Sequence, residues 1–495
     1  MLRAGPGLVR LGGSIGRSCT LFAVTSPEAI QASTDTSSAA PSPSPSPSTA
    51  NAPAGPLRIG VLGCGNVGAA FVALVDSGTE SISARTGIEL EVARIAVRDL
   101  SRDRSPVDRG RFEARATTDP HSIVADPQID VVVELMGGVE PARTLIIEAL
   151  AAGKPVISGN KELLATSAGE LAKAAEAAGV DLLFEASVAG AIPLVRLLRE
   201  SLAGEHIVRL TGIVNGTTNY MLTRMSDEGL GYAEALAEAQ ALGYAEADPT
   251  ADVEGYDAAA KAAILAGIAF DADVRAADVY REGIASIQAS DIAFAHRLGY
   301  EVKLLAIAER SGPPAAPGGR LAPSVAVRVH PAMVPKDHPL ASVRGSFNAV
   351  FVEGDAAGEL MVYGRGAGGR PTASAVLGDV IDAAHHLREG SRARSVRRHA
   401  PDLRPISELR SQYYLTLDVV DQPGVLASVA SVFGDHHVSI RSMEQTGLTG
   451  EARLVFITHT ALEADVSATL EALRDLDSVE RIGSVLRVIG PEPNS

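Results

Sequence analysis

The chain has 495 residues, with 44 Lys and Arg against 60 Asp and Glu, so its formal net charge is −16. A negative balance of this size argues against nucleic acid as the main partner. No apolar run approaches the ~18 residues that a membrane-spanning helix needs, so we expect no membrane partner. The two cysteines, Cys19 and Cys64, are too few for a disulfide framework or a zinc cage, which predicts a reducing, cytoplasmic location.

The first 56 residues differ in composition from the rest of the chain. A Ser-Pro repeat at Pro41–Ser48 cannot bury a core, so we expect a disordered tail. Arg3, Arg10 and Arg17 stand beside very few acids, which loosely imitates a transit peptide, although no apolar region marks secretion. A mis-assigned start or a tail without function is equally compatible with this composition.

Residues 57–184 predict a Rossmann-type, dinucleotide-binding domain, because strands alternate with helices there and such alternation produces a parallel sheet. The expected strands lie at 57–62, 89–97, 129–135 and 155–157, and an expected helix lies at 141–152. The fold class is therefore α/β in this part of the chain.

Residues 185–387 predict an α+β domain for catalysis and dimerisation, a few C-terminal residues of which return to the Rossmann part. Its β-branched runs lie at 207–214, 324–329 and 349–353, and it contains a Gly/Pro/Ala loop at Gly312–Gly319. Residues 388–410, rich in Arg and Pro, are typical of a linker.

The last segment, residues 411–490, predicts a compact domain with the strand and helix order βαββαβ, which is the ferredoxin-like motif. The expected strands are 413–420, one that starts at 438–440, 452–459 and 484–489, and the expected helices are 425–433 and 464–474.

Gly63, Gly65 and Gly68 form the pattern Gly-x-Gly-x-x-Gly between an expected strand and an expected helix. In this context the glycines let the backbone approach a pyrophosphate at the helix N-terminus. With Asn66 and Val67 they are the expected contacts of a dinucleotide cofactor. The alternative is a plain strand-to-helix turn.

Arg98 follows the second strand, with Arg102 and Arg104 beyond it. A basic group at this position can hold a 2′-phosphate, whereas an acid such as Asp99 prefers a free ribose hydroxyl. The three arginines favour NADP, and NAD stays possible.

Several acids and a lysine lie close together between residues 243 and 261. Glu246 and Asp252 fall on a loop broken by Gly and Pro, while Asp257 and Lys261 are four apart and share one face of a helix. A lysine near carboxylates can hold a small zwitterion and pass a proton. The alternative is a solvated helix face with an ordinary ion pair.

Three more positions are candidates. Lys161 follows the strand at 155–157, where ligands bind in open α/β sheets, although it could be a surface lysine at a helix start. Thr217 belongs to a run of small polar residues that suits a carboxylate or a ribose, or else Thr217 or Thr218 caps a helix. Gly366 lies in a second Gly-rich loop that could approach the nicotinamide.

These features resemble a known family. GCGNVG, GNKELL, EASVAGAIP, IVNGTTNYMLT, GYAEADPTADVEGYDAAAK and GRGAGGRPTASAV occur in the order found in homoserine dehydrogenases, over residues 57–387. The sequence DQPGVL at 421–426 resembles an ACT domain, and the whole is similar to the monofunctional form. The resemblance implies interconversion of aspartate 4-semialdehyde and homoserine with NADPH or NADH, on the route to threonine, isoleucine and methionine.

The resemblance also implies roles for residues at matching positions. Lys261 corresponds to the catalytic proton donor and Lys161 to a lysine near cofactor and substrate. Glu246 and Asp257 correspond to residues that hold the amino and hydroxyl ends of homoserine, with Asp252 nearby. Gly243 corresponds to a cofactor contact. A structural sodium site is implied at backbone positions of Glu185, Val188, Gly190 and Ile192.

The ACT resemblance implies regulation. We expect threonine to bind between ACT domains near Asp421, Gly424 and Val425 and to inhibit, because the free N–H groups of the Pro-Gly turn could take a carboxylate. The alternative is a dimerisation module that binds nothing. A homodimer or a homotetramer is expected on the resemblance and on the frequency of symmetric oligomers among soluble enzymes.

Two other functions are possible. The chain could be an idle amino-acid sensor that has kept the fold, or a dehydrogenase of another amino-acid aldehyde. The presence of Lys161, Lys261, Glu246 and Asp257 argues against the sensor. An acylating semialdehyde dehydrogenase is disfavoured, because it requires a thiolate and neither cysteine is placed as a nucleophile.

Overall fold

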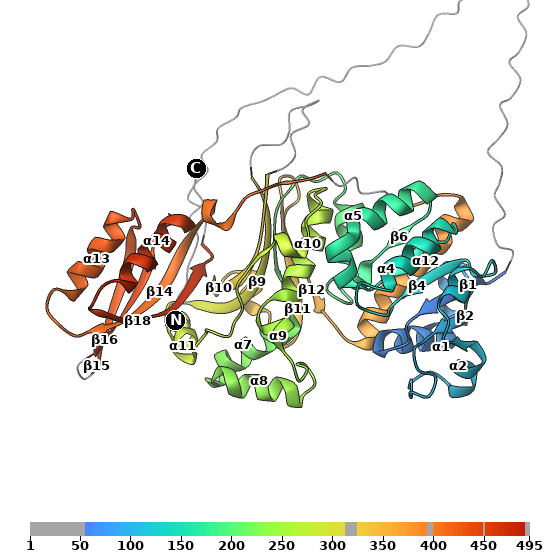
Figure 1. Cartoon of the computed structure of the whole chain (residues 1–495), viewed down its shortest axis with the longest axis horizontal. Coiled ribbons are helices and arrows are strands. Elements are labelled where there is room, and N and C mark those ends of the chain that lie inside the picture. The colour runs from blue at the N-terminus through green and yellow to red at the C-terminus, as the bar shows by residue number, and fades with distance from the viewer. Residues whose placement is uncertain (1–54, 312–323, 394–398, 449–450, 491–495) are drawn as a thin grey trace, which may run out of the picture. The chain divides into compact units, whose positions relative to one another are not determined.

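The computed structural model describes residues 55–311, 324–393, 399–448 and 451–490 (Figure 1). The first 54 residues, which make up nearly all of the expected tail and include Cys19, lie outside this range, as does the expected loop at Gly312–Gly319. Within the described ranges, no helix combines the length and the apolar character needed to span a bilayer.

The N-terminal sheet is parallel and has six strands, as expected for a Rossmann-type domain. Its strands are β1 (Leu57–Leu62), β2 (Leu90–Ala96), β3 (Ala116–Thr117), β4 (Val131–Glu134), β5 (Val156–Ser158) and β6 (Leu182–Leu183). Their order is β3-β2-β1-β4-β5-β6, so the strand order reverses between β1 and β4. Ligands bind at such a reversal, beyond the carboxyl ends of the strands.

Helices flank this sheet, and one of them comes from far along the chain. They are α1 (Asn66–Thr86), α2 (Arg109–Arg115), α3 (His121–Val124), α4 (Ala142–Ala151), α5 (Lys161–Ala178) and α12 (Gly369–Glu389). Val376 and Val380 of α12 share a buried cluster with Phe71 of α1, and the two helices lie side by side (Figure 1). A whole helix therefore returns to the Rossmann part, which is more than the few residues expected.

The middle of the chain contributes strands to a second sheet, separate from the parallel one. Its long strands are β7 (Ile207–Ile213), β9 (Tyr300–Ser311), β10 (Ser324–Pro335), β11 (Phe347–Gly354) and β12 (Gly358–Arg365), in the order β12-β11-β7-β9-β10. The short strand β8 (Tyr280–Arg281) pairs with β10. The helices of this part are α6 (Leu194–Arg196), α7 (Gly216–Glu228), α8 (Tyr232–Ala241), α9 (Thr250–Val253), α10 (Tyr256–Ala269) and α11 (Ala289–Arg297).

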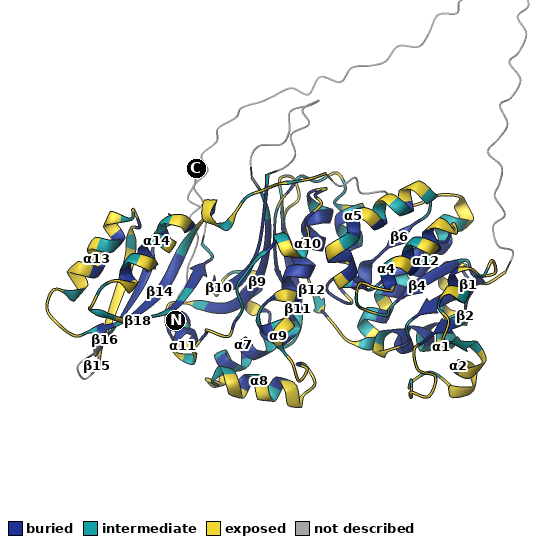
Figure 2. Ribbon diagram, in the orientation of Figure 1, coloured by how far each residue is buried: buried dark blue, intermediate teal, exposed yellow. Residues whose placement is uncertain are grey.

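The C-terminal part has the βαββαβ order that the sequence predicts. It contains β14 (Arg410–Val420), α13 (Val425–Asp435), β15 (Ile440–Leu448), β16 (Glu451–Thr458), α14 (Glu463–Arg474) and β18 (Val479–Val488), with a short β17 (Ala461–Leu462) before α14. The sheet order is β18-β14-β16-β15, and its inner face is buried (Figure 2). Leu415, Phe433 and Phe456 belong to its core.

The C-terminal strands continue the middle sheet, which the sequence did not predict. Strand β18 pairs in parallel with β10, with Arg487 opposite Ala332. The described residues of the expected linker at 388–410 include regular structure: α12 runs to Glu389, and β13 (Asp402–Leu403) also pairs with β10. Residues 402 and 403 of this segment thus extend the sheet that contains β10.

Candidate active site

The turn between β1 and α1 forms the wall of a cleft at the carboxyl edge of the parallel sheet. Gly63 has a φ of 97°, and a Cβ on Gly68 would lie 2.3 Å from the carbonyl oxygen of Gly63, so the turn requires glycine at both positions. Gly65 faces open space and precedes Asn66 and Val67, which begin α1 without a side-chain cap. Uncapped N–H groups beside open space fit the pyrophosphate of a dinucleotide.

The cleft has a volume of about 810 Å³ and reaches the end of β2. Arg98, Asp99 and Arg102 line its outer end, and all three are exposed. Arg104 also lines the cleft, but its guanidinium donates to the carbonyl oxygen of Arg102 at 2.7 Å and stacks on Phe112. The exposed guanidinium groups of Arg98 and Arg102 lie where this fold holds the adenosine ribose.

Five polar side chains, none of which lines this cleft, contact one another around the carboxylate of Asp257. Its Oδ2 accepts a hydrogen bond from Lys261 Nζ at 2.7 Å and another from Asn215 Nδ2 at 2.8 Å. Its Oδ1 pairs with the ammonium of Lys161. The amide of Asn215 also donates to Asp252 at 2.7 Å. Two ammonium groups and two carboxylates thus balance one another in one place.

Two helix N-termini bring these groups together. Lys161 is the first residue of α5, whose cap Asn160 accepts from the backbone N–H of Leu163 at 3.1 Å. Helix α10 follows Gly255, whose φ of 79° turns the chain and places Asp257 in the first helical turn. The carbonyl oxygen of Val214, at the end of β7, accepts a second hydrogen bond from Lys261 Nζ at 2.7 Å.

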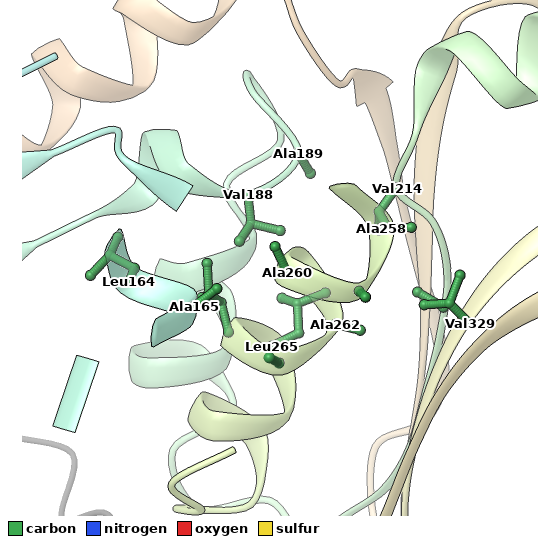
Figure 3. Packing of buried hydrophobic residues seen from close by; sticks show 14 of the residues in the cluster. Leu164, Ala165, Val188, Ala189, Val214, Ala258, Ala260, Ala262, Leu265 and Val329 are labelled. Carbon is green, nitrogen blue, oxygen red and sulfur yellow. The ribbon is translucent and has the colours of Figure 1, made fainter. Parts of the chain in front are cut away.

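Helix α10 is held rigidly because nearly all of its surface is buried. Figure 3 shows Leu164 of α5 and Val188 on one side of the helix, packed against Ala260 and Leu265, and Val329 of β10 on the other side. An alanine-rich sequence allows such close packing on both sides. The lysine and the carboxylate therefore project from a fixed backbone, which suits a catalytic pair.

The lysines keep Asp257 ionised. Burial alone would raise the pKa of Asp257, but the charges of Lys261 and Lys161 outweigh it and hold the pKa below the usual range. Burial would likewise lower the pKa of Lys161, and the charge and hydrogen bond of Asp257 reverse this and raise it. Asp257 and Lys161 therefore form an ion pair at neutral pH.

A pocket of about 240 Å³ lies beside these lysines. Its walls come from the ends of β4 and β5, the loop after β6 and the second Gly-rich loop, and they include Gly137, Gly159, Asn160, Lys161, Ser187, Gly190, Lys261, Gly366 and Thr372. Gly366 of the second Gly-rich loop thus lines the same pocket as Lys161 and Lys261.

Three predicted residues share no hydrogen bond or ion pair with the lysine pair among the described residues. Glu246 is exposed on the loop before α9, and within the described ranges no hydrogen bond joins its carboxylate to the cluster. Thr217 is buried and donates to the carbonyl oxygen of Tyr244 at 2.7 Å, so it anchors that loop. Gly243 ends α8 and lines neither the cleft nor the pocket.

The residue that caps the N-terminus of α7 differs from the two that the sequence suggested. Asn215, rather than Thr217 or Thr218, is the cap, because its side-chain oxygen accepts from the backbone N–H of Thr218 at 2.8 Å. Its amide nitrogen then faces the two carboxylates. One side chain thus joins the start of α7 to the start of α10.

Sequence reasoning missed two buried polar residues at this edge. Glu134 ends β4 and accepts hydrogen bonds from Ser158 Oγ at 2.7 Å and from Asn160 Nδ2 at 3.4 Å, and burial raises its pKa. Asn348 on β11 is fully buried, and neither polar atom of its amide has a partner among the described residues. A Cβ on Gly366 would lie 2.0 Å from that amide.

The loop after β6 contains the positions of the implied sodium site. The carboxylate of Glu185 accepts from the backbone N–H groups of Val195 and Arg196 at 2.8 Å each, so its side chain is occupied. Within the described ranges, no backbone N–H donates to the carbonyl oxygens of Val188 or Gly190. Free carbonyl oxygens fit a hard cation. No cluster of His, Cys, Asp and Glu side chains suited to a metal occurs in the described ranges.

The turn proposed for regulation precedes α13. Asp421 and Gly424 are exposed, Val425 is half-buried, and Gly424 has a φ of 93°. Helix α13 has no side-chain cap, so its first N–H groups are available to a carboxylate.

Comparison with known proteins gives consistent matches along the chain. A family model described as homoserine dehydrogenase matches residues 193–381, and one described as homoserine dehydrogenase, NAD binding domain, matches residues 63–185. A model described as ACT domain matches residues 413–478. The three models follow the order of the three folded parts.

Whole proteins match as well. The homoserine dehydrogenase of Mycobacterium tuberculosis is 50% identical over 443 residues, which cover 88% of this chain and 98% of that protein. The enzyme of Corynebacterium glutamicum is 48% identical over 437 residues, with 88% and 96% covered. A crystal structure of a homoserine dehydrogenase from Thiobacillus denitrificans superimposes with a TM-score of 0.80 at 39% identity, with 88% and 98% covered.

Proposed function

This chain belongs to the homoserine dehydrogenase family and is an NAD(P)-dependent oxidoreductase. From that premise we propose a role in the reaction for each residue of the site. The single observation that carries the proposal is the shared carboxylate of Asp257, which pairs with Lys261 and Lys161 beside the pocket that both lysines line. We assign proton transfer to Lys261 and substrate placement to the groups around it.

Bound dinucleotide supplies or accepts the hydride at the substrate carbon. In the reductive direction negative charge develops on the aldehyde oxygen of aspartate 4-semialdehyde, and the ammonium of Lys261 stabilises this charge and donates the proton. In the oxidative direction the neutral amine of Lys261, formed when the ammonium has lost its proton, takes the hydroxyl proton of L-homoserine and becomes the ammonium again. Val214 and Asp257 hold Nζ at 2.7 Å each, which fixes the direction from which the proton moves.

The acids nearby bind the amino-acid end of the substrate. We assign the ammonium of homoserine to Asp252 and Glu246, and we place Asp257 near its hydroxyl end. Glu246 lies on an exposed loop, which Thr217 anchors through Tyr244, so this loop can approach the substrate from outside. Lys161 lines the smaller pocket and pairs with Asp257, which supports a role in contacting both ligands.

We propose NADP as the preferred cofactor. Arg98 and Arg102 are exposed at the outer end of the cleft and can pair with a 2′-phosphate. Asp99 is also there, so a slower reaction with NAD is expected. Gly243 lines neither pocket, and we expect it to contribute to the loop rather than to cofactor binding.

The ACT domain supports a regulatory proposal. We propose that threonine binds near Asp421, Gly424 and Val425 between two ACT domains and inhibits the enzyme, as feedback in the synthesis of threonine, isoleucine and methionine. The uncapped start of α13 supports carboxylate binding there. If threonine, isoleucine and methionine all leave the rate unchanged, this proposal fails.

A sodium ion at the loop after β6 is a further proposal. The unpaired carbonyl oxygens of Val188 and Gly190 support it, with Glu185 and Ile192 completing the loop. Replacing sodium by tetramethylammonium should then lower the unfolding temperature. An unchanged unfolding temperature would contradict the site.

Three predictions from the sequence remain proposals. They are the division into a tail, a Rossmann domain, a catalytic domain, a linker and an ACT domain at the stated boundaries, the cytoplasmic location, and assembly as a homodimer or homotetramer. Sedimentation of the purified protein would decide the last of these.

The function is tested by the formation of reduced dinucleotide from L-homoserine, first with NADP and then with NAD. We expect a clear rate with NADP and a smaller one with NAD. If the protein binds the dinucleotide but does not oxidise homoserine, a panel of other amino alcohols separates a different substrate from an idle sensor, since only the sensor would leave all of them unchanged.

A further inference from the structure

The turn that carries Asp252 and Asp257 is backed by a short segment of chain, residues 280–284. The guanidinium of Arg281 lies 3.4 Å from the ring centroid of Tyr256, the first residue of α10, and it donates to the carbonyl oxygen of Glu254 at 3.1 Å. The backbone N–H of Ile284 donates to the carbonyl oxygen of Val253 at 2.8 Å. Both ends of the acid-bearing turn, residues 252–257, are thus attached to this segment.

The fit between the segment and the turn is tight. A Cβ on Gly283 would lie 2.3 Å from the carbonyl oxygen of Val253 and 2.7 Å from the Cα of Glu254. A Cβ on Gly255 would lie 3.3 Å from Val329 and 3.4 Å from the carbonyl oxygen of Glu282. A displacement of residues 280–284 must therefore be passed to the turn, because packed interiors deform little.

The opposite face of the same segment contacts the ACT domain. Glu282 forms two hydrogen bonds of 3.0 Å with Nη1 of Arg487, which belongs to β18, and the hydroxyl of Tyr280 lies 3.4 Å from Nη2. On its other side Arg487 pairs with Glu463 of α14 at 2.6 Å. Side chains alternate along an extended chain, so Tyr280 and Glu282 face Arg487 while Arg281 faces the turn.

Arg487 is almost completely buried, which makes this contact costly to break. Burial would lower its pKa, but the charges of Glu282 and Glu463 outweigh burial and raise it. Removing one partner of a buried pair leaves the other charge uncompensated. The backbone reinforces the contact, since β8 pairs with β10 at Arg328 and Val329 and β18 pairs with β10 at Ala332 and Met333.

We propose that Arg281 is a positioning residue for the reaction, which fixes the acid-bearing turn, and that Arg487 connects the ACT domain to it through Glu282. A change at β18 then alters the placement of Asp252 and Asp257, and with it the binding of homoserine rather than of the dinucleotide. This inference rests on the proposed role of those two acids in substrate binding.

The kinetic test uses the full-length protein with Arg281→Met, Arg487→Met and both together. Arg281→Met should raise KM for homoserine roughly tenfold, as expected for the loss of one hydrogen bond and one stacking contact, with the Kd for NADP unchanged. Arg281→Lys should recover part of the loss. The two substitutions together should raise KM by less than the product of their separate effects, because coupled positions are non-additive.

A matched control removes a charge from the ACT domain alone. Arg453 on β16 pairs with Asp418 on β14 at 2.7 Å and does not contact the catalytic part in any hydrogen bond between described residues. Arg453→Met should leave KM for homoserine unchanged. An unchanged KM in folded Arg281→Met, or an equal rise in the Kd for NADP, would overturn the positioning role. If KM for homoserine in the double variant rises by the product of the two separate factors, the connection through Arg487 is overturned.

A second measurement does not depend on the reaction. Hydrogen–deuterium exchange of the peptide that covers residues 250–257 should be faster in Arg487→Met than in the wild type and in Arg453→Met. Unchanged exchange would contradict the connection even if the enzyme is active. If the wild type fails to oxidise homoserine while exchange responds as expected, the assigned substrate is wrong and the connection stands.

Discussion

Lys261 Nζ lies 2.7 Å from Oδ2 of Asp257, one helical turn earlier on α10. The other oxygen of the same carboxylate pairs with Lys161, which comes from the Rossmann part of the chain. One buried carboxylate thus orients two ammonium groups from different domains. Removing the carboxylate of Asp257 would therefore leave both lysines without this counter-charge.

Asp257→Asn should lower kcat/KM for homoserine by at least ~100-fold, because both lysines lose their shared counter-charge. Breaking a buried pair should also cost about 3 kcal/mol of unfolding free energy. Urea denaturation and initial rates measure the two effects. Glu113→Gln breaks an exposed pair with the same spacing, Arg109–Glu113, and should change stability by less than about 0.5 kcal/mol. Equal effects of the two substitutions would contradict this account.

Asp379 on α12 should make stability depend on pH. Its carboxylate accepts from the backbone N–H of Glu185 at 2.8 Å, and burial raises its pKa to about 8. An unfolded Asp titrates near ~3.9, so the folded state retains a proton that the unfolded state loses, and the free energy of unfolding falls as pH rises from about 4 to about 8.

Asp379→Asn should remove this slope. The free energy of unfolding of the variant minus that of the wild type should increase with pH, by at most about 1.4 kcal/mol per pH unit. This difference should level off above about pH 8. Urea unfolding at four pH values provides the measurement. Parallel curves for the two proteins would show that Asp379 is ionised in the folded state.

Gly366→Ala should displace the second Gly-rich loop, because the new Cβ would lie 2.0 Å from Cγ of Asn348. We expect kcat/KM to fall roughly tenfold or more, as misplacement of a substrate-positioning loop does. Asn348→Ala in the same protein should restore part of the activity by making room. Gly434→Ala, which meets open space, is the control and should have no effect. Failure of Asn348→Ala to restore activity would show that the two residues do not clash.

Arg98→Ala should raise KM for NADP roughly tenfold, the usual effect of losing a charged hydrogen bond, and leave KM for NAD unchanged. Kinetics with both dinucleotides measure this directly. Arg109→Ala, on the exposed surface of α2, serves as the control. An equal rise for both dinucleotides would mean that Arg98 binds a part that they share.

Local patterns predicted much of the fold. The Gly63–Gly68 turn, the parallel strands around it and the βαββαβ order of the last part follow from periodicity and turn chemistry, which act within a few residues. Helix α12 joining α1 and strand β18 joining β10 were not foreseen in full, since pairing between distant segments leaves no local signal.

The same limit applies to the site. Helical spacing predicts that Asp257 and Lys261 share one face, and their ion pair confirms this. Asn348 and Glu134 were missed because an isolated polar residue in a strand has no distinctive spacing. The sequence predicts a ligand role for Thr217 but not its hydrogen bond to the carbonyl oxygen of Tyr244, a contact that depends on the fold.

The central claim is that Lys261 transfers the proton, and initial rates of homoserine oxidation with NADP test it most directly. Lys261→Met should lower kcat by at least ~100-fold while the Kd for NADP stays unchanged. Lys173→Met, at an exposed position of α5, should match the wild type. A Lys261→Met enzyme that keeps a rate within about fivefold of the wild type would contradict the claim, since general acid catalysis contributes far more than that.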